Sequence, residues 1–257
     1  MEKDGKYIYC IVASEQDSYF GSIGIGEEEN LVHTIGCDGL CMVVSDHPLS
    51  RFVVSPENIL AHQKVLEKVM EEYNSVLPVK FGTIASTADE IRNLLSKRAV
   101  EFKRLLGAFE NKVEINIKGT WKNINMIFQE IDQEDHSVQE IRKQVNALED
   151  EKRKKEKMVE AGLLVQKALE NKKELEAEEI VHEFKRTIFE YKHNPINSDP
   201  MFMNTAFLLN KGRAKEFDFL MEDIALKSAN RIDFKCTGPL PAFNFIDLQV
   251  FPEEWEV

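Results

Sequence analysis

The chain has 257 residues, 43% of them hydrophobic, so it can bury the core of one large domain or of two ordinary ones. Its formal net charge of −12 argues against proteins that bind nucleic acids or anionic membrane surfaces, because both need basic patches. The first residues lack the apolar stretch of a secretory signal and no run of 18 apolar residues follows, so neither a signal peptide nor a membrane span is expected.

The first residues after the start predict a β-rich segment. Residues 7–13 form a nearly continuous apolar run, which is typical of a central strand. The loop that follows has the spacing G-x-x-G-x-G and then an acidic run, so it does not predict a phosphate site. Asp38-Gly39 lies between apolar residues 31–35 and 40–45, which predicts a β-hairpin.

Two helices and a short strand complete the predicted first domain, residues 1–110. Ser55-Pro56 predicts the start of a helix whose apolar face includes His62. We interpret His62 as a hydrogen-bonded core or interface histidine rather than a catalyst. Residues 77–82 predict a short strand, and a capping box at residues 87–90 predicts one helix that ends near Asn111.

The predicted second domain, residues 111–257, opens with a strand over 113–117 and a short helix over 121–131. Heptad spacing before and after a charged run at 149–157 predicts an antiparallel helical hairpin over about 133–193. We interpret the charged run as a solvated helix face or connector rather than an interaction patch.

The rest of this domain predicts a sheet. Residues 201–209 and 231–237 indicate strands that flank a helix centred on Phe217, and Ile246, Leu248 and Val250 alternate as in a last strand. In the strand from residue 113, Glu114 alternates outward with polar neighbours. The fold class expected is α+β, with a modified ferredoxin-like second domain whose first crossover carries the helical hairpin.

Catalytic and metal-binding signatures are weak. The six histidines do not form H-E-x-x-H, and neither G-x-S-x-G nor a P-loop motif occurs. The four cysteines are Cys10, Cys37, Cys41 and Cys236. They form no C-x-x-C motif, so we expect reduced thiols in a cytoplasmic protein. Cys37 and Cys41 alone are a weak signal for a metal site. We expect no enzyme activity, cofactor or metal.

Three stretches together resemble the gas vesicle protein F/L family. The first is residues 7–12, with Cys10 where the family often has glycine. The second is residues 77–82, with Lys80 where the family usually has arginine, and the third pairs residues 204–210 with the closing motif at 237–245. His62 also matches a histidine often seen on the family's first long helix.

This resemblance implies a two-domain α+β protein without known enzymatic activity that is needed to build gas vesicles in the cytoplasm. The implied partners are the small, hydrophobic shell protein and other gas vesicle accessory proteins, and the protein itself would be an assembly factor or a minor shell component. The physical argument is that shell subunits expose apolar surface until they polymerise, and an acidic protein with an apolar groove or a free sheet edge could shield it.

Two groups of residues are the candidate sites. The partner interface is expected in the first domain, at Leu77, Pro78, Lys80, Phe81 and His62. The closing segment is expected to be structural and to pack the two domains together, through Gly238, Pro239, Pro241, Phe243, Asn244 and Phe245. If the Phe243 ring is fully buried, its truncation to alanine should cost roughly 3–5 kcal/mol.

Two other classes of function stay open. One is a ligand-binding protein or a small-molecule enzyme on a ferredoxin-like scaffold, because that fold carries many activities. A pocket with converging polar groups would favour it, whereas an exposed apolar groove would favour the assembly function. The other is a coiled-coil scaffold, which is weaker because the heptads last only about two repeats.

Overall fold

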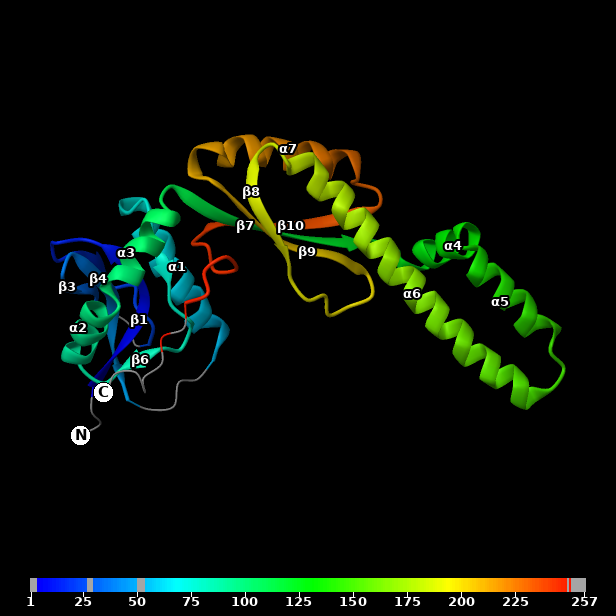
Figure 1. Cartoon of the computed structure of the whole chain (residues 1–257), viewed down its shortest axis with the longest axis horizontal. Helices are drawn as coiled ribbons and strands as arrows, with labels where there is room; N and C mark the ends of the chain where they lie inside the picture. Colours follow the sequence, from blue (N-terminus) through cyan, green and yellow to red (C-terminus); the bar gives the residue numbers. More distant parts are fainter. Residues whose placement is uncertain (1–3, 27–29, 50–53, 249, 251–257) are drawn as a thin grey trace. The chain divides into compact units, whose positions relative to one another are not determined.

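The structure is a computed structural model that describes residues 4–26, 30–49, 54–248 and 250 (Figure 1). It is a mixed α+β fold with two sheets, as the sequence predicts. The chain divides into two compact units. Unit 1 contains the described residues up to 115 together with 208–212 and those from 238 onward, and unit 2 contains 116–207 and 213–237. The predicted domains 1–110 and 111–257 are continuous stretches, a different division that stays a prediction.

The sheet of unit 1 is antiparallel and is built around β1, which pairs with β4, β5 and β6. Residues 7–12 of β1 are all buried, which explains their unbroken apolar sequence. The strand order is β2-β3-β4-β1-β5. The strands are β1 (Asp4–Ala13), β2 (Tyr19–Gly21), β3 (Val32–Cys37), β4 (Leu40–Pro48), β5 (Leu77–Pro78) and β6 (Ile84–Ala85).

Local sequence signals account for most connections in unit 1. Asp38 and Gly39 have φ angles of 56° and 78°, the positive values that a tight hairpin turn requires, so the predicted hairpin is confirmed. Helix α1 (Pro56–Glu72) begins after Ser55, whose Oγ accepts the Asn58 N–H at 3.2 Å. The helix predicted after residue 87 is two helices, α2 (Ala88–Lys97) and α3 (Ala99–Ala108), because Arg98 between them leaves helical geometry.

The second sheet has the order β10-β7-β9-β8. Along the chain its strands and helices run β-α-β-β-α-β, with the helical hairpin in the first crossover, which is the ferredoxin-like sequence of elements. Its strands are β7 (Lys112–Trp121), β8 (Ile188–His193), β9 (Met201–Asn210) and β10 (Ile232–Leu240).

Two predictions about these strands are wrong. Residues 188–193 were expected at the end of the helical hairpin because Ile188 and Tyr191 have a helical spacing, but they form β8, where β-branched and aromatic residues favour a strand. Residues 246–248 and 250 do not form the expected last strand. Leu248 and Val250 instead pack into the core of unit 1 from irregular backbone.

The helices of unit 2 confirm the predicted hairpin. In Figure 1, α5 and α6 run side by side away from the sheet, with α4 beside them. The charged run at 149–157 covers the loop and the first turns of α6, where most side chains are exposed, as a solvated helix face requires. The helices are α4 (Ile124–Glu134), α5 (His136–Ala147), α6 (Glu151–Phe184) and α7 (Ala214–Lys227), with a 3-10 turn, η1 (Lys211–Arg213), before α7.

The core of unit 2 is aromatic. Phe184 of α6 stacks on Phe217 of α7 with ring centroids 4.3 Å apart, and both contact Phe207 of β9. The end of α6 and α7 therefore share a buried cluster with the sheet. No helix in the parts of the chain that the structure describes is both long and apolar enough to cross a membrane.

The closing segment is held within unit 1 by a buried carboxylate. Glu114 was expected to point outward from its strand, but its side chain is fully buried. It accepts the backbone N–H of Asn244 at 2.8 Å and the side-chain Nδ2–H at 2.6 Å. Gly238 has a φ of +143° and lies so close to this strand that a Cβ would meet the Glu114 carbonyl oxygen at 2.8 Å, so only glycine fits there.

These contacts shift the stability prediction from Phe243 to Asn244. The Phe243 ring is 38% exposed, so the condition of full burial is not met and Phe243→Ala should cost about 1 kcal/mol or less. Asn244→Ala should lower the free energy of unfolding by about 2–3 kcal/mol, because it removes a donor to a buried carboxylate. Urea unfolding of both variants measures the difference, and a larger loss for Phe243→Ala would contradict it.

Candidate functional site

The residues expected to bind a partner lie together in unit 1, but most of them are covered. Leu77 and Pro78 form β5 and are buried against β1. Phe81 is partly exposed, and its ring centroid lies 5.4 Å from that of His62, which is only 5% exposed. Lys80 is the exposed residue of this group. The predicted partner surface therefore depends on Lys80 and the outer part of Phe81.

His62 is a hydrogen-bonded core histidine, as the sequence favours. Its Nδ1 lies 2.9 Å from the Tyr7 hydroxyl, which also accepts the Gly82 N–H at 3.0 Å. Its Nε2 has no hydrogen-bond partner within the described ranges. Burial lowers the pKa of this imidazole to about 4, so it is neutral at pH 7. The histidine thus links α1 to β1 and to the segment after β5 rather than offering a catalytic base.

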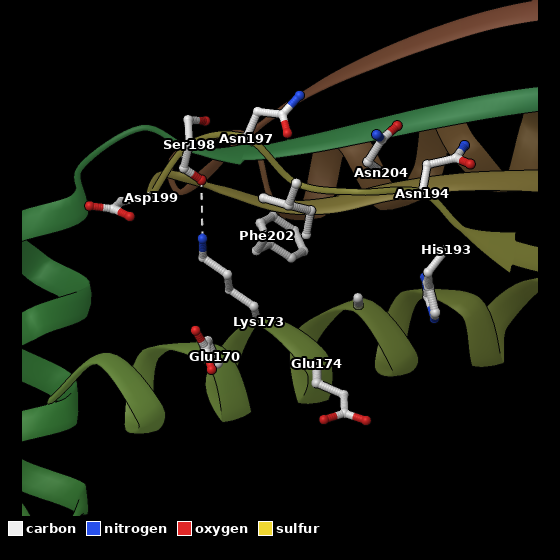
Figure 2. A pocket seen from close by; sticks show the side chains of 12 residues that line it. Glu170, Lys173, Glu174, His193, Asn194, Asn197, Ser198, Asp199, Phe202 and Asn204 are labelled. Atoms are coloured by element: carbon white, nitrogen blue, oxygen red, sulfur yellow. Dashed lines mark hydrogen bonds between the residues drawn. The ribbon is translucent and has the colours of Figure 1, made fainter. Parts of the chain in front are cut away.

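A polar depression of about 550 Å³ lies in unit 2 between α6 and the connection from β8 to β9 (Figure 2). Figure 2 shows Lys173 reaching from α6 to the Ser198 carbonyl oxygen, with a separation of 3.0 Å. Asn204 Nδ2 donates to the Pro195 carbonyl at 2.8 Å, so the polar groups here hold the loop in shape. Partial burial lowers the pKa of Lys173.

His193, at the edge of this depression, is held on both sides. Its Nδ1 lies 2.8 Å from Thr205 Oγ1, and its Nε2 lies 2.9 Å from Glu178 Oε1. The Tyr191 hydroxyl donates to the same carboxylate. Thr205 is fully buried, and the arrangement attaches β8 to α6 and β9.

An apolar groove of about 370 Å³ lies where α4, α5 and α6 meet, and we call it the hairpin groove. On α6 its wall is formed by Met158, Ala161 and Val165, which are spaced for one face of a helix. Met158 is 57% exposed, whereas Val138 and Ile141 at the base are buried. The other lining residues are Phe128, Ile131, Asp132, Arg142, Val145 and Asn146.

Two of the three helices that form the groove, α4 and α6, are tied to the sheet of unit 2 by a charged cluster. Arg231, just before β10, donates to both carboxylate oxygens of Glu130 on α4 and to Glu176 on α6 at 2.6 Å. The Trp121 indole N–H donates to the other oxygen of Glu176 at 2.7 Å, and Lys172 pairs with Glu130 at 3.1 Å. The Arg231 guanidinium and Lys172 hold the pKa of Glu130 at about 2.

Comparison with known proteins places this architecture in a family. A family model described as gas vesicle synthesis protein GvpL/GvpF matches residues 5–247. The chain belongs to the GvpL/GvpF family. Gas vesicle protein F of Dolichospermum flosaquae is 24% identical over 229 residues, which cover 87% of this chain and 90% of the relative. Gas vesicle protein F of Microcystis aeruginosa is 23% identical over 250 residues, which cover 95% and 98%.

Solved structures share the fold of this GvpL/GvpF chain. The crystal structure of GvpF from Anabaena sp. PCC7120 superimposes with a TM-score of 0.79 at 20% identity, covering 96% of this chain and all of that one. GvpF from Microcystis aeruginosa gives a TM-score of 0.77 at 22% identity, covering 95% and 99%. The resemblance read from the sequence motifs is therefore confirmed at the level of the family.

Sequence patterns predict only half of the hairpin groove. The heptad spacing before the charged run comes from Val138, Ile141 and Val145, whereas the start of α6 is predicted only as a charged face. The missed signal is the spacing of Met158, Ala161 and Val165 at i, i+3 and i+7, directly after the charged run. In this member of the family the groove is thus an exposed apolar feature of the hairpin.

Acid should destabilise unit 1 through His62. Because the folded-state pKa of about 4 lies below the usual 6.5, the unfolded chain takes up a proton first as the pH falls. Stability should be unaffected by this group above pH 6.5 and should fall by about 3 kcal/mol by pH 4. Urea unfolding at several pH values measures this loss, and His62→Gln should remove most of it. An unchanged pH profile in His62→Gln would show that other groups are responsible.

Loss of Arg231 should loosen the hairpin. Arg231→Leu leaves Glu130 and Glu176 without their shared partner, and we expect the free energy of unfolding to fall by about 2–3 kcal/mol. The control is Arg92→Leu, which breaks the exposed pair of Arg92 with Asp89 on α2 and should cost less than about 0.5 kcal/mol. Thermal and urea unfolding compare the two, and equal losses would contradict the assigned function of Arg231.

Proposed function

We propose that this protein is an assembly factor or minor structural component of gas vesicles that binds the small, hydrophobic shell protein and helps to start or build the vesicle. The proposal takes its setting from the family match over residues 5–247. The observation that carries it is the hairpin groove, an exposed apolar surface on an otherwise acidic, highly charged chain. The protein would work at the gas vesicle within the cytoplasm, together with other accessory proteins and without a catalytic function.

The physical argument concerns apolar surface that has no partner before polymerisation. A shell subunit that has not yet joined the wall exposes apolar side chains, and such surface aggregates in water. The hairpin groove offers a complementary apolar wall centred on Met158. The net charge of −12 keeps a complex of the two proteins dispersed, because like-charged complexes repel each other.

A second candidate function is the binding of a small polar molecule in the depression of Figure 2. Its volume is within the range of ligand pockets. However, Lys173, His193 and Asn204 are engaged in bonds that shape the surrounding chain. The groove therefore supports the assembly function better than the depression supports ligand binding.

The test is co-expression of the full-length tagged chain with the shell protein of the same gene cluster, followed by capture on the tag. Full-length protein is needed because unit 1 uses three separate segments, so cutting after residue 110 would divide it. We expect the shell protein to be retained. Absence of capture, with the shell protein shown to be soluble when expressed alone, would contradict the proposed function.

The same assay tests the partner surface expected in unit 1. Lys80→Glu reverses the charge of its exposed residue, and capture should fall severalfold, about threefold or more, if this surface contributes. Lys103→Glu on α3 is the control, since it makes the same charge change at another exposed site of unit 1. Equal capture by both variants would show that the residues around Leu77 and Phe81 serve the fold and not the partner.

A further inference from the structure

We propose that the hairpin groove is the docking site for a short amphipathic helix whose apolar face is bordered by acidic residues. This inference deepens the proposed function and rests on it, because it names the kind of partner segment that the groove would hold. The argument has three parts: the shape of the groove, the backbone that surrounds it and the charges at its rim.

The shape of the groove suits a helix of about two turns. Its α6 wall runs from Met158 to Val165, a separation of seven residues that spans about 10 Å. Apolar side chains at positions i, i+3 or i+4, and i+7 of a docked helix cover the same length on one face. A volume of about 370 Å³ holds a few aliphatic side chains, with buried Val138 and Ile141 as its floor.

The walls of the groove consist only of helices, which decides the mode of binding. The backbone groups of α4, α5 and α6 are used inside these helices, so an added strand would find no free sheet edge in the groove. A fourth helix, by contrast, can pack its side chains between those of the three that are present. Docking through apolar side chains is therefore the mode that this surface allows.

The rim of the groove selects the charge of the partner. The charged run at 149–157 contains five basic and four acidic side chains, a slight excess of positive charge in a chain whose total is −12. Lys154 precedes Met158 by four residues, and Lys157 precedes Ala161 by four, so both lie on the groove side of α6. Lys157 also pairs with Glu160 at 2.7 Å.

The acidic side chains at the rim offset part of this charge, with Glu160 beside Lys157. Arg142 lies in the lining and pairs with Asp132, so this pair is close to neutral. Acidic residues beside the apolar face of a partner helix would meet Lys154 and Lys157. A second copy of this chain is disfavoured as the occupant, because its own α6 would bring the same basic turns to the rim.

The test uses two synthetic helical peptides as probes, both with the same leucines at i, i+3 and i+7. One carries glutamates beside the leucines and the other carries lysines, and binding to the full-length chain is measured by fluorescence anisotropy. The acidic peptide should bind about tenfold more tightly than the basic one, and the difference should shrink as salt is added. Lys154→Glu combined with Lys157→Glu should reverse the preference.

Matched variants on α6 locate the binding. Met158→Asp, in the groove, should weaken binding of the acidic peptide about tenfold or more. Leu163→Asp is the control, because Leu163 is similarly exposed, at 63%, but lies outside the groove lining. Equal affinity for the two peptides, or equal weakening by both aspartate variants, would overturn the inference. If the wild-type chain forms a dimer that the Met158→Asp variant does not form, the groove holds a second copy of the chain, and the inference is also overturned.

Shell-protein capture separates this inference from the proposed function. If Met158→Asp captures the shell protein as well as the wild type does, the groove is not its docking site, although the proposed function stands. If the wild-type chain binds the acidic peptide but captures no shell protein, the proposed function fails and the groove remains a site for a helix. Circular dichroism of each variant shows whether α6 is still folded.

Discussion

The helical hairpin depends on the bridge that Arg231 makes between Glu130 and Glu176. A single guanidinium has enough donors to serve both carboxylates, and it joins α4 to α6 near the sheet. Trp121 closes the cluster with its indole N–H on Glu176. Since the hairpin groove lies between these helices, its shape depends on a charged contact at the sheet and not only on packing inside the groove.

Helix α6 divides into two halves with different environments. Its last turns are buried, with Val181 and Phe184 fully inside the core of unit 2. Its first turns extend past the sheet, where only α5 and α4 cover one side, so Met158 stays largely exposed. A helix of 34 residues cannot be covered along its length by a sheet whose strands have ten residues or fewer. The exposed apolar surface follows from this difference in length.

Unit 1 shows the opposite arrangement. Its motif residues Leu77 and Pro78 are inside the sheet, and His62 is a neutral buried imidazole that bonds to Tyr7. Because these side chains are buried, the motif at residues 77–82 resembles the family in sequence but offers little surface to a partner. The acidic residue Glu114 has a similar structural function, because it holds the closing segment through Asn244. The motif residues that resemble the family thus mostly stabilise the fold, whereas the hairpin groove is formed by residues outside those motifs.

The sequence alone determined the features that depend on neighbouring residues. The turn at Asp38-Gly39, the start of α1 at Ser55, the antiparallel hairpin and the family resemblance follow from local chemistry and from motifs read along the chain. Only the tertiary structure decided β8, because Ile188 and Tyr191 have the i, i+3 spacing of a helix face and pairing with β9 holds the segment as a strand. It also decided the burial of Glu114 and the groove, since each requires contacts between segments distant in sequence, and no local pattern specifies which distant segments will meet.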